Sequence, residues 1–222
     1  MNHFLVSKFD VCWIPDAEGS DNLSGELSHK YRKPGNATYI GPLSRFSFHD
    51  VKKEIDLLIL LSGPEPQRTL LENILQEQVR SFLNRSANRA FKVLLIRGVS
   101  EGMSEITTPD ENFSIIDCMN SEQLNAAMLS ADLILSRPGY STIMDLAVLG
   151  KKAIFIPTPG QTEQEYLATH FKRAGIFYSE PQEIFDLNRA LIASANYHGL
   201  QKNRKPISHI GDHIYQLLGQ LK

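Results

Sequence analysis

Cysteine is scarce in this sequence of 222 residues, and its scarcity excludes a disulfide framework. Cys12 and Cys118 stand far apart and lack the spacing of a metal site, which indicates a reducing compartment. His209 and His213 lie four residues apart, but two ligands are too few to hold a metal. We therefore expect neither a bound metal nor a disulfide in this protein.

An excess of one charge and long apolar runs are also missing. The chain has 23 Lys and Arg against 25 Asp and Glu, and its densest basic cluster, 202–205, is only a few residues long. Nucleic-acid binders usually carry a basic face or tract, so no nucleic-acid partner is expected. The longest apolar runs, such as 57–61, fall far short of the ~20 residues that cross a bilayer. No signal peptide opens the chain, which favours a cytoplasmic protein.

What the sequence does contain is a regular alternation of apolar strand-like runs with segments of helical period. Strands are predicted at 9–14, 37–40, 56–61, 91–96, 114–116, 133–135, 153–156 and 176–178. Helices are predicted at 68–84, 121–129, 140–149, 163–174, 181–193 and 208–221. From residue 56 onward this alternation predicts βαβ units, and the strands are apolar throughout, as burial on both faces requires. The fold class is therefore α/β, a doubly wound parallel sheet with helices on both faces.

The pattern also divides the chain into three parts. Residues 49–205 are expected to form the doubly wound domain, and 206–222 an amphipathic C-terminal helix. Residues 1–48 hold two short strands with loops, too little to make a core of their own. They are expected to be the remnant of a preceding domain and its linker.

The most informative stretch for function runs from a predicted strand straight into a helix, through Arg137, Pro138 and Gly139. Free amides and the positive end of a helix dipole favour an anion such as a diphosphate, and Ser141 and Thr142 add hydroxyls there. Asp145 follows one turn later and can accept hydrogen bonds from the vicinal hydroxyls of a ribose. The alternative is a capped helix with a surface aspartate, and the stretch alone leaves both open.

A second polar stretch follows the strand at 153–156, after a rigid Pro-x-Pro-Gly turn. Thr162 with Glu165 forms a capping-box pattern, which would account for these two residues as helix caps. It does not explain Gln161 and Gln164. Amides and a carboxylate together at a strand end suit the recognition of sugar hydroxyls.

Three weaker signals complete the list of candidates. Gly63 lies in the turn after the strand at 56–61, where a loop could approach a phosphate, although a plain turn fits equally well. The backbone at Ile116 ends another strand and could bind the edge of a base. Arg45, in the linker, is the second cation placed to face a phosphate, after Arg137.

Residues 131–168 resemble a known family, the C-terminal donor-binding domain of family 28 glycosyltransferases, which are MurG-like enzymes of GT-B fold. The shared pattern is a strand, Arg-x-Gly, a helix with an acid, Gly150, an apolar strand ending in Pro157, then Gln and Tyr. The likeness extends over about residues 36–180 and includes Gly41 to Arg45, similar to the segment that leaves the family's N-terminal domain.

The resemblance implies a UDP-sugar ligand, N-acetylglucosamine-like, with no metal or other cofactor. The ribose site has Asp145 where the family usually has Glu, and the sugar site has a Gln-Glu pair where the MurG pattern has two Gln. The implied contacts are the Ile116 backbone for uracil, Asp145 for ribose, Gly139, Tyr140, Ser141 and Thr142 for the diphosphate, and Gln164 and Glu165 for the sugar.

The implied reaction is an inverting displacement of the sugar onto an acceptor, which is unknown and could be lipid-linked. The resemblance places this work in cell-envelope glycan synthesis, with a peripheral position at the inner face of the membrane as one option. The family's general base lies in the N-terminal domain, so the catalytic residue is not named here. We expect the missing part to be a further segment or a partner chain, and the isolated chain to bind donor weakly and transfer poorly. Two alternatives stay open: a UDP-sugar hydrolase or 2-epimerase of GT-B-like fold, and a non-catalytic donor-domain subunit.

Overall fold

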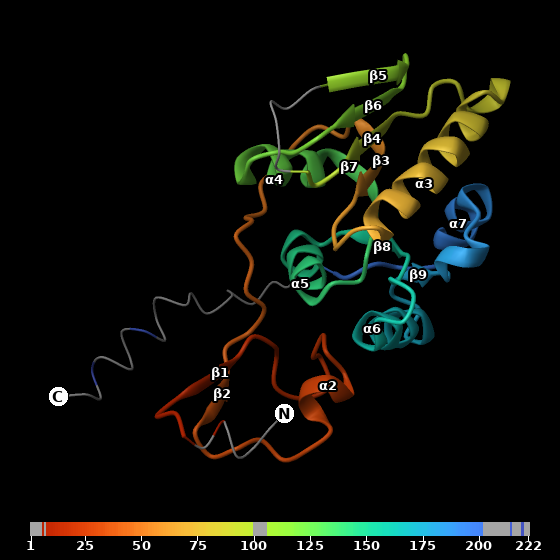
Figure 1. The fold of residues 1–222 in the computed structure, drawn as a ribbon. Coiled ribbons are helices and arrows are strands. Elements are labelled where there is room, and N and C mark those ends of the chain that lie inside the picture. Colours follow the sequence, from red (N-terminus) through yellow and green to blue (C-terminus); the bar gives the residue numbers. More distant parts are fainter. Residues whose placement is uncertain (1–5, 7, 100–105, 202–213, 215–218, 220–222) are drawn as a thin grey trace.

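A seven-stranded sheet frames the chain in the computed structural model, which describes residues 6, 8–99, 106–201, 214 and 219. Its strands are β3 (Ile55–Leu60), β4 (Val93–Ile96), β5 (Ile106–Asp110), β6 (Phe113–Ile116), β7 (Ala131–Ser136), β8 (Lys152–Phe155) and β9 (Tyr178–Ser179). Their order across the sheet is β5-β6-β4-β3-β7-β8-β9, and all neighbours are parallel except β5 and β6 (Figure 1).

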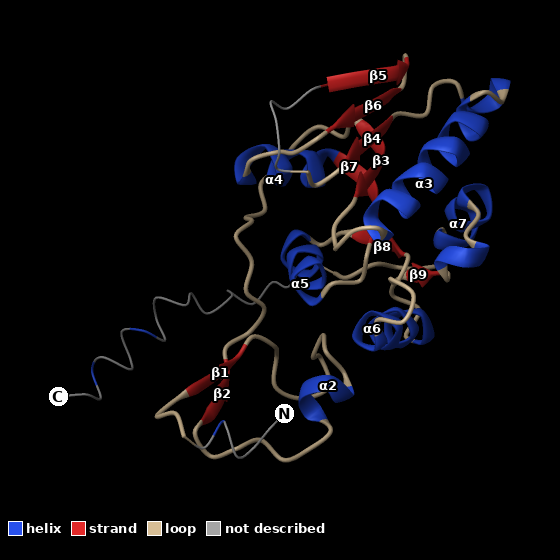
Figure 2. Ribbon diagram, viewed as in Figure 1, coloured by secondary structure: helices blue, strands red, loops and turns tan. Residues whose placement is uncertain are grey.

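Helices cover both faces of this sheet, as Figure 2 shows. They are α3 (Gln67–Leu83), α4 (Ser121–Ser130), α5 (Tyr140–Leu149), α6 (Thr162–Arg173) and α7 (Leu187–Ser194). One apolar core joins the sheet to α4, α5 and α6, and a second joins it to α3 and α7. Within β3, Leu58 points into the first core, while Leu57 and Ile59 point into the second, and all three are 0% exposed. The doubly wound α/β fold predicted from the sequence is confirmed.

One strand was not predicted, and one predicted helix is divided. The unpredicted strand is β5, which runs antiparallel along the outer edge of β6 in an otherwise parallel sheet. All five residues of β5 are exposed and include Pro109, so no hydrophobic pattern marked the strand. The single helix predicted at 181–193 is a 3₁₀ turn, η2 (Gln182–Ile184), followed by α7. The break comes from Asp186, whose carboxylate caps α7 by accepting from the Arg189 N–H.

The described residues before 49 form a small unit of their own, below the sheet in Figure 1. It contains β1 (Cys12–Ile14), the single helical turn α2 (Glu26–His29) and β2 (Ala37–Tyr39), and the two strands pair in parallel. The unit is bonded to the sheet domain, because Tyr140 donates to the Pro15 carbonyl and the Glu26 N–H donates to the Tyr166 hydroxyl. The short strands expected here are present. The predicted C-terminal helix at 208–221 lies outside the described residues, apart from 214 and 219.

Two lysines share the same pair of carbonyls at the start of β7. The ammonium groups of Lys53 and Lys151 each lie 2.7–2.8 Å from the oxygens of Leu129 and Ala131. Lys151 is 5% exposed, and burial, with the neighbouring Lys53 charge, lowers its pKa to about 7, against the weaker opposing pull of Asp132.

This buried amine predicts a pH-dependent stability. The unfolded chain keeps the Lys151 proton up to a pKa of about 10.4, whereas the folded chain releases it near pH 7. The unfolded state thus binds more protons between these values, so the free energy of unfolding rises with pH, by at most about 1.4 kcal/mol per pH unit. Urea titrations from pH 7 to 10 should show this rise in the natural chain and a flatter curve in Lys151→Met.

The exposed neighbour provides the control, because Lys152→Met should leave the pH slope unchanged. Parallel pH curves for the natural chain and Lys151→Met would contradict the assignment.

Candidate functional site: a cavity where the strand order reverses

The strand order reverses between β3 and β7, and a cavity opens at that point. From β3 the chain winds outward through β4 to β6, then returns to β7 and winds the other way. The loops after β3 and β7 therefore diverge and leave a crevice at the carboxyl ends of the strands, where open α/β sheets bind ligands. The cavity found there has a volume of about 580 Å³. It is lined by Leu43, Arg45, Phe46, Leu60, Leu61, Ser62, Ile96, Gly98, Cys118, Met119, Leu124, Met128, Ser136, Ser141, Thr142 and Asp145.

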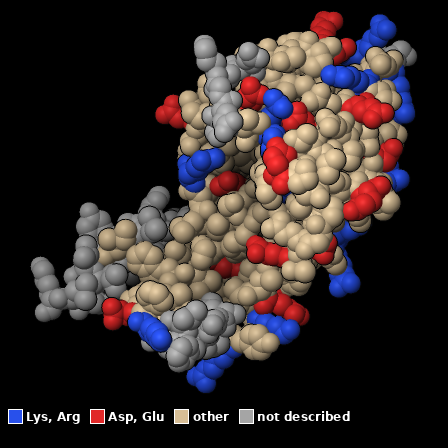
Figure 3. Space-filling view, in the orientation of Figure 1, with Lys and Arg blue, Asp and Glu red and all other residues tan. Residues whose placement is uncertain are grey.

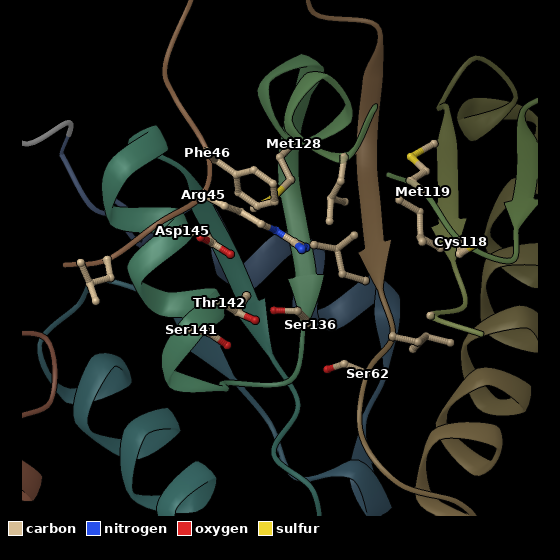
Figure 4. A pocket seen from close by; sticks show the side chains of 16 residues that line it. Arg45, Phe46, Ser62, Cys118, Met119, Met128, Ser136, Ser141, Thr142 and Asp145 are labelled. Atoms are coloured by element: carbon tan, nitrogen blue, oxygen red, sulfur yellow. The ribbon is translucent and has the colours of Figure 1, made fainter. Parts of the chain in front are cut away.

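The cavity has a hydroxyl-rich end and an apolar end, as Figure 4 shows. Hydroxyls come from the ends of β3 and β7 and from the first turn of α5: Ser62, Ser136, Ser141 and Thr142. The other end is formed by Phe46 and Met128, with Met119 to one side, and the Arg45 guanidinium lies 5.0 Å from the centroid of the Phe46 ring. Such an arrangement suits a ligand that is anionic at one end and carries a flat, mostly apolar group at the other.

Asp145 lies between these two ends and is already hydrogen-bonded. The Ser44 hydroxyl donates to its carboxylate at 2.5 Å, and the Phe46 N–H donates to the same hydroxyl at 3.0 Å. Burial raises the pKa of Asp145, while the Ser44 hydrogen bond and the Arg45 charge oppose the rise. Among the described residues the second carboxylate oxygen has no hydrogen-bond partner, so it can accept from ligand hydroxyls.

The first turn of α5 presents uncapped amides to the hydroxyl-rich end. Its N-cap is Gly139, no side chain caps the helix there, and the first turn carries no acid. A Cβ at position 139 would meet only the Thr142 hydroxyl, at 3.8 Å, which is an ordinary contact. The space over this backbone is thus open to a ligand, and the helix dipole favours an anion in it.

Arg137 does not reach the cavity. Its side chain is 2% exposed, and its guanidinium donates to the carbonyls of Ile156, Pro157 and Gln67 and to the Gln182 side chain. Burial lowers the pKa of Arg137 to about 10. The guanidinium instead holds the start of α3, the loop after β8 and η2 together.

We therefore predict that Arg137 stabilises the folded domain. In Arg137→Lys the ammonium cannot reach all four acceptors, so buried carbonyls lose their partner and the free energy of unfolding falls by about 2–4 kcal/mol. Chemical denaturation measures this loss. A variant as stable as the natural chain would contradict the assignment.

Gln164 and Glu165 hold their own loop. The Gln164 side-chain oxygen accepts from the Thr158 N–H, and the Glu165 carboxylate accepts from the Gly160 N–H, both at 2.9 Å. The capping box expected from Thr162 is wrong, because the N-cap of α6 is Gln161 and no side chain caps the helix. Neither Gln164 nor Glu165 lines the cavity. In the described part of the chain, no hydrogen-bond partner is found for the Gln164 amide nitrogen or for the other Glu165 oxygen.

Four further predicted residues flank the cavity without lining it, and the first of them is Gly139, the N-cap of α5. Gly63 follows Ser62 in the turn after β3. Ile116 ends β6, and its carbonyl accepts from the Arg97 N–H at 2.9 Å. Tyr140 turns away, because its hydroxyl donates to the Pro15 carbonyl. Of the predicted set, the structure brings together Arg45, Ser141, Thr142 and Asp145.

Several lining residues were missed by the sequence reasoning. Gly98 lies in the loop after β4 with φ +70°, and a Cβ there would lie 2.5 Å from the Leu61 carbonyl oxygen, so glycine is required. A glycine two residues after a predicted strand was a usable signal. Cys118, Met119 and Ser136 offered none, because only the fold brings them to the cavity.

A charged network fixes the loops at this edge of the sheet. Glu72 of α3 is 4% exposed and accepts from Arg68 and Arg97. Arg97 also donates to Asp117 at 2.8 Å, and these carboxylates raise the pKa of Arg97. The loops that carry Gly98 and Cys118 are therefore tied to one helix.

Other kinds of site receive no support from the described residues. No group of three His, Cys, Asp or Glu able to hold a metal occurs among them. Within the same part of the chain, no helix is both long and apolar enough to cross a bilayer. Basic and acidic side chains are interspersed on the face shown in Figure 3.

Comparison with known proteins identifies the class. The sequence profile of the glycosyltransferase family 28 C-terminal domain matches residues 58–202, so the chain belongs to this family. The cavity lies within the matched region, apart from the part contributed by Leu43, Arg45 and Phe46.

Two curated relatives carry the same name, UDP-N-acetylglucosamine–N-acetylmuramyl-(pentapeptide) pyrophosphoryl-undecaprenol N-acetylglucosamine transferase. The Oenococcus oeni protein is 24% identical over 165 residues, which cover 66% of this chain and 44% of the relative. The Methylobacterium nodulans protein is 37% identical over 70 residues, which cover 31% and 19%. The chain thus spans less than half of the length of either relative.

Solved structures agree on the fold. The crystal structure of Acinetobacter baumannii MurG superposes with a TM-score of 0.53 and 14% identity, covering 98% of this chain and 64% of that one. The glycosyltransferase of kitacinnamycin gives a TM-score of 0.56 and 16% identity, covering 83% and 49%. The fold of a GT-B C-terminal domain, expected from the sequence, is confirmed.

Proposed function

We propose that this chain is the donor-binding part of a glycosyltransferase that uses a UDP-sugar. The observation that carries the proposal is the cavity at the strand reversal, which combines an uncapped helix start, a carboxylate and an apolar end. Membership of family 28 and the UDP-N-acetylglucosamine in the relatives' names support a nucleotide-sugar donor.

The proposed binding mode follows the polarity of the cavity. The diphosphate lies at the start of α5, near Gly139, Ser141 and Thr142, with Arg45 adding positive charge. The ribose hydroxyls donate to Asp145, and the uracil lies toward the apolar end, near the loop after Ile116. In this assignment the anionic diphosphate meets hydrogen-bond donors and positive charge, the ribose hydroxyls meet an acceptor, and the flat base meets apolar side chains.

The proposed reaction is direct displacement at the anomeric carbon with inversion. The bond from this carbon to the diphosphate breaks while the acceptor oxygen attacks from the opposite side. Negative charge grows on the leaving diphosphate, and the amides of α5 stabilise it more strongly as it grows. Residues of this chain would bind and orient the donor, and no metal takes part in the scheme.

Acceptor recognition and the general base are proposed to come from outside the cavity described here. The relatives are more than twice as long as the matched region, and their names include a pyrophosphoryl-undecaprenol acceptor. A lipid-linked acceptor, a further domain or partner chain, and a peripheral position at the membrane are consistent with this. We expect the isolated chain to bind donor weakly and to transfer little or no sugar.

The sugar is proposed to lie against the start of α6. Gln164 and Glu165 each keep one polar atom beyond the hydrogen bond to their own loop. An amide nitrogen can donate and a carboxylate oxygen can accept, so together they can read the hydroxyls of an N-acetylglucosamine-like sugar.

The first test is calorimetric titration with UDP. Asp145→Ala removes the acceptor of the ribose hydroxyls, so UDP binding should weaken by ~1–3 kcal/mol. The control is Asp132→Asn, which changes an exposed carboxylate at the opposite end of β7 and should leave UDP affinity unchanged. Equal affinities in Asp145→Ala and the natural chain, or no binding at millimolar UDP, would contradict the donor site.

A second test concerns the Ser44 hydroxyl. Its hydrogen bond stabilises the ionised Asp145, so Ser44→Ala should raise the pKa of this carboxyl further. Protonation removes acceptor capacity of the Asp145 carboxylate. As the pH is lowered, UDP affinity should therefore begin to fall at a higher pH in the variant than in the natural chain. Ser44→Thr keeps the hydroxyl and should restore the profile, whereas identical pH profiles in all three proteins would refute the coupling.

A further inference from the structure

The Ser136 hydroxyl is buried without a hydrogen-bond partner. Ser136 ends β7 and is 2% exposed, and its carbonyl accepts from the Ile156 N–H at 3.0 Å. Its side-chain oxygen has no partner in the described structure. The other such atom among the described residues, on Asn125, lies outside the cavity lining.

An unpaired buried hydroxyl destabilises the folded state, because folding removes its hydrogen bonds to water and no hydrogen bond within the protein replaces them. Such a group calls for an explanation, and a ligand that completes its hydrogen bond is one. Ser136 lines the cavity, and in Figure 4 its hydroxyl lies beside Thr142 with Ser62 across from it. This is the same end of the cavity at which the uncapped amides of α5 begin.

We propose that the Ser136 hydroxyl donates a hydrogen bond to a phosphate oxygen of a bound nucleoside diphosphate. The inference rests on the proposed function and assigns a binding residue that neither the sequence pattern nor the comparisons indicate. An anion fits this place because the helix start is positive and its first turn holds no acid. The neighbouring hydroxyls of Ser62 and Thr142 can donate to the same group.

The hydrogen bond also has a consequence for leaving-group departure. As the glycosidic bond breaks, negative charge collects on the phosphate oxygens that Ser136 faces. A fixed donor in a site that excludes water interacts more strongly as that charge grows. The unpaired hydroxyl is then the cost of having this donor in place before the ligand binds.

The experiment compares Ser136→Ala with the natural chain, using UDP and uridine as probes. UDP affinity should fall about 10- to 100-fold, as expected for a lost hydrogen bond to a charged group. Affinity for uridine, which has no phosphate, should stay within about twofold. The unfolding temperature without ligand should stay equal or rise, because the variant removes an unpaired polar atom.

Ser130→Ala is the matched control. Ser130 immediately precedes β7, and its hydroxyl donates to the Ala127 carbonyl. Its loss should leave UDP affinity unchanged.

Three results would overturn the assignment. Unchanged UDP affinity in Ser136→Ala, with the natural chain binding UDP, would refute the role of Ser136 alone. An equal loss for UDP and uridine, with a lower unfolding temperature, would show a structural role. Absence of UDP binding by the natural chain would refute the donor site, and Ser136 with it.

Discussion

The burial of β3 and β7 between two helical layers is the constraint on which the structure depends. Both strands are apolar because each face meets a core, and their parallel pairing places Leu60 opposite Ser136. The two strands therefore end at the same level, and their loops must leave in opposite directions. The cavity is a consequence of that divergence. The residues that follow each strand line it, and no additional structural element is needed to place them there.

This constraint also explains how much of the fold could be predicted from the sequence. Strands buried on both faces and helices with one apolar stripe leave a periodic signal, and those elements were found with boundaries shifted by a few residues at most. The strand β5 left none, because every residue in it is exposed. The break before α7 depends on one capping carboxylate, Asp186, within a segment whose apolar pattern continues.

The site was predictable only in part, for a related reason. Ser141, Thr142 and Asp145 follow a strand within one helical turn, so local spacing was enough to place them together. The direction of a side chain at a strand end is not local, and Arg137 turns away from the cavity while Ser136, its neighbour, lines it. Gly98 comes from another loop altogether, and only the strand order brings it near.

The buried guanidinium of Arg137 bears on the order of the loops at this edge of the sheet. It ties the beginning of α3, the loop after β8 and η2 to one point through four acceptors. Loops are usually the most mobile parts of a domain, and ordering them on binding reduces affinity. Here that ordering is accomplished when the chain folds. Under the proposed function the loop after β8 leads to the sugar contacts at the start of α6, and its order before binding reduces the entropic cost of forming them.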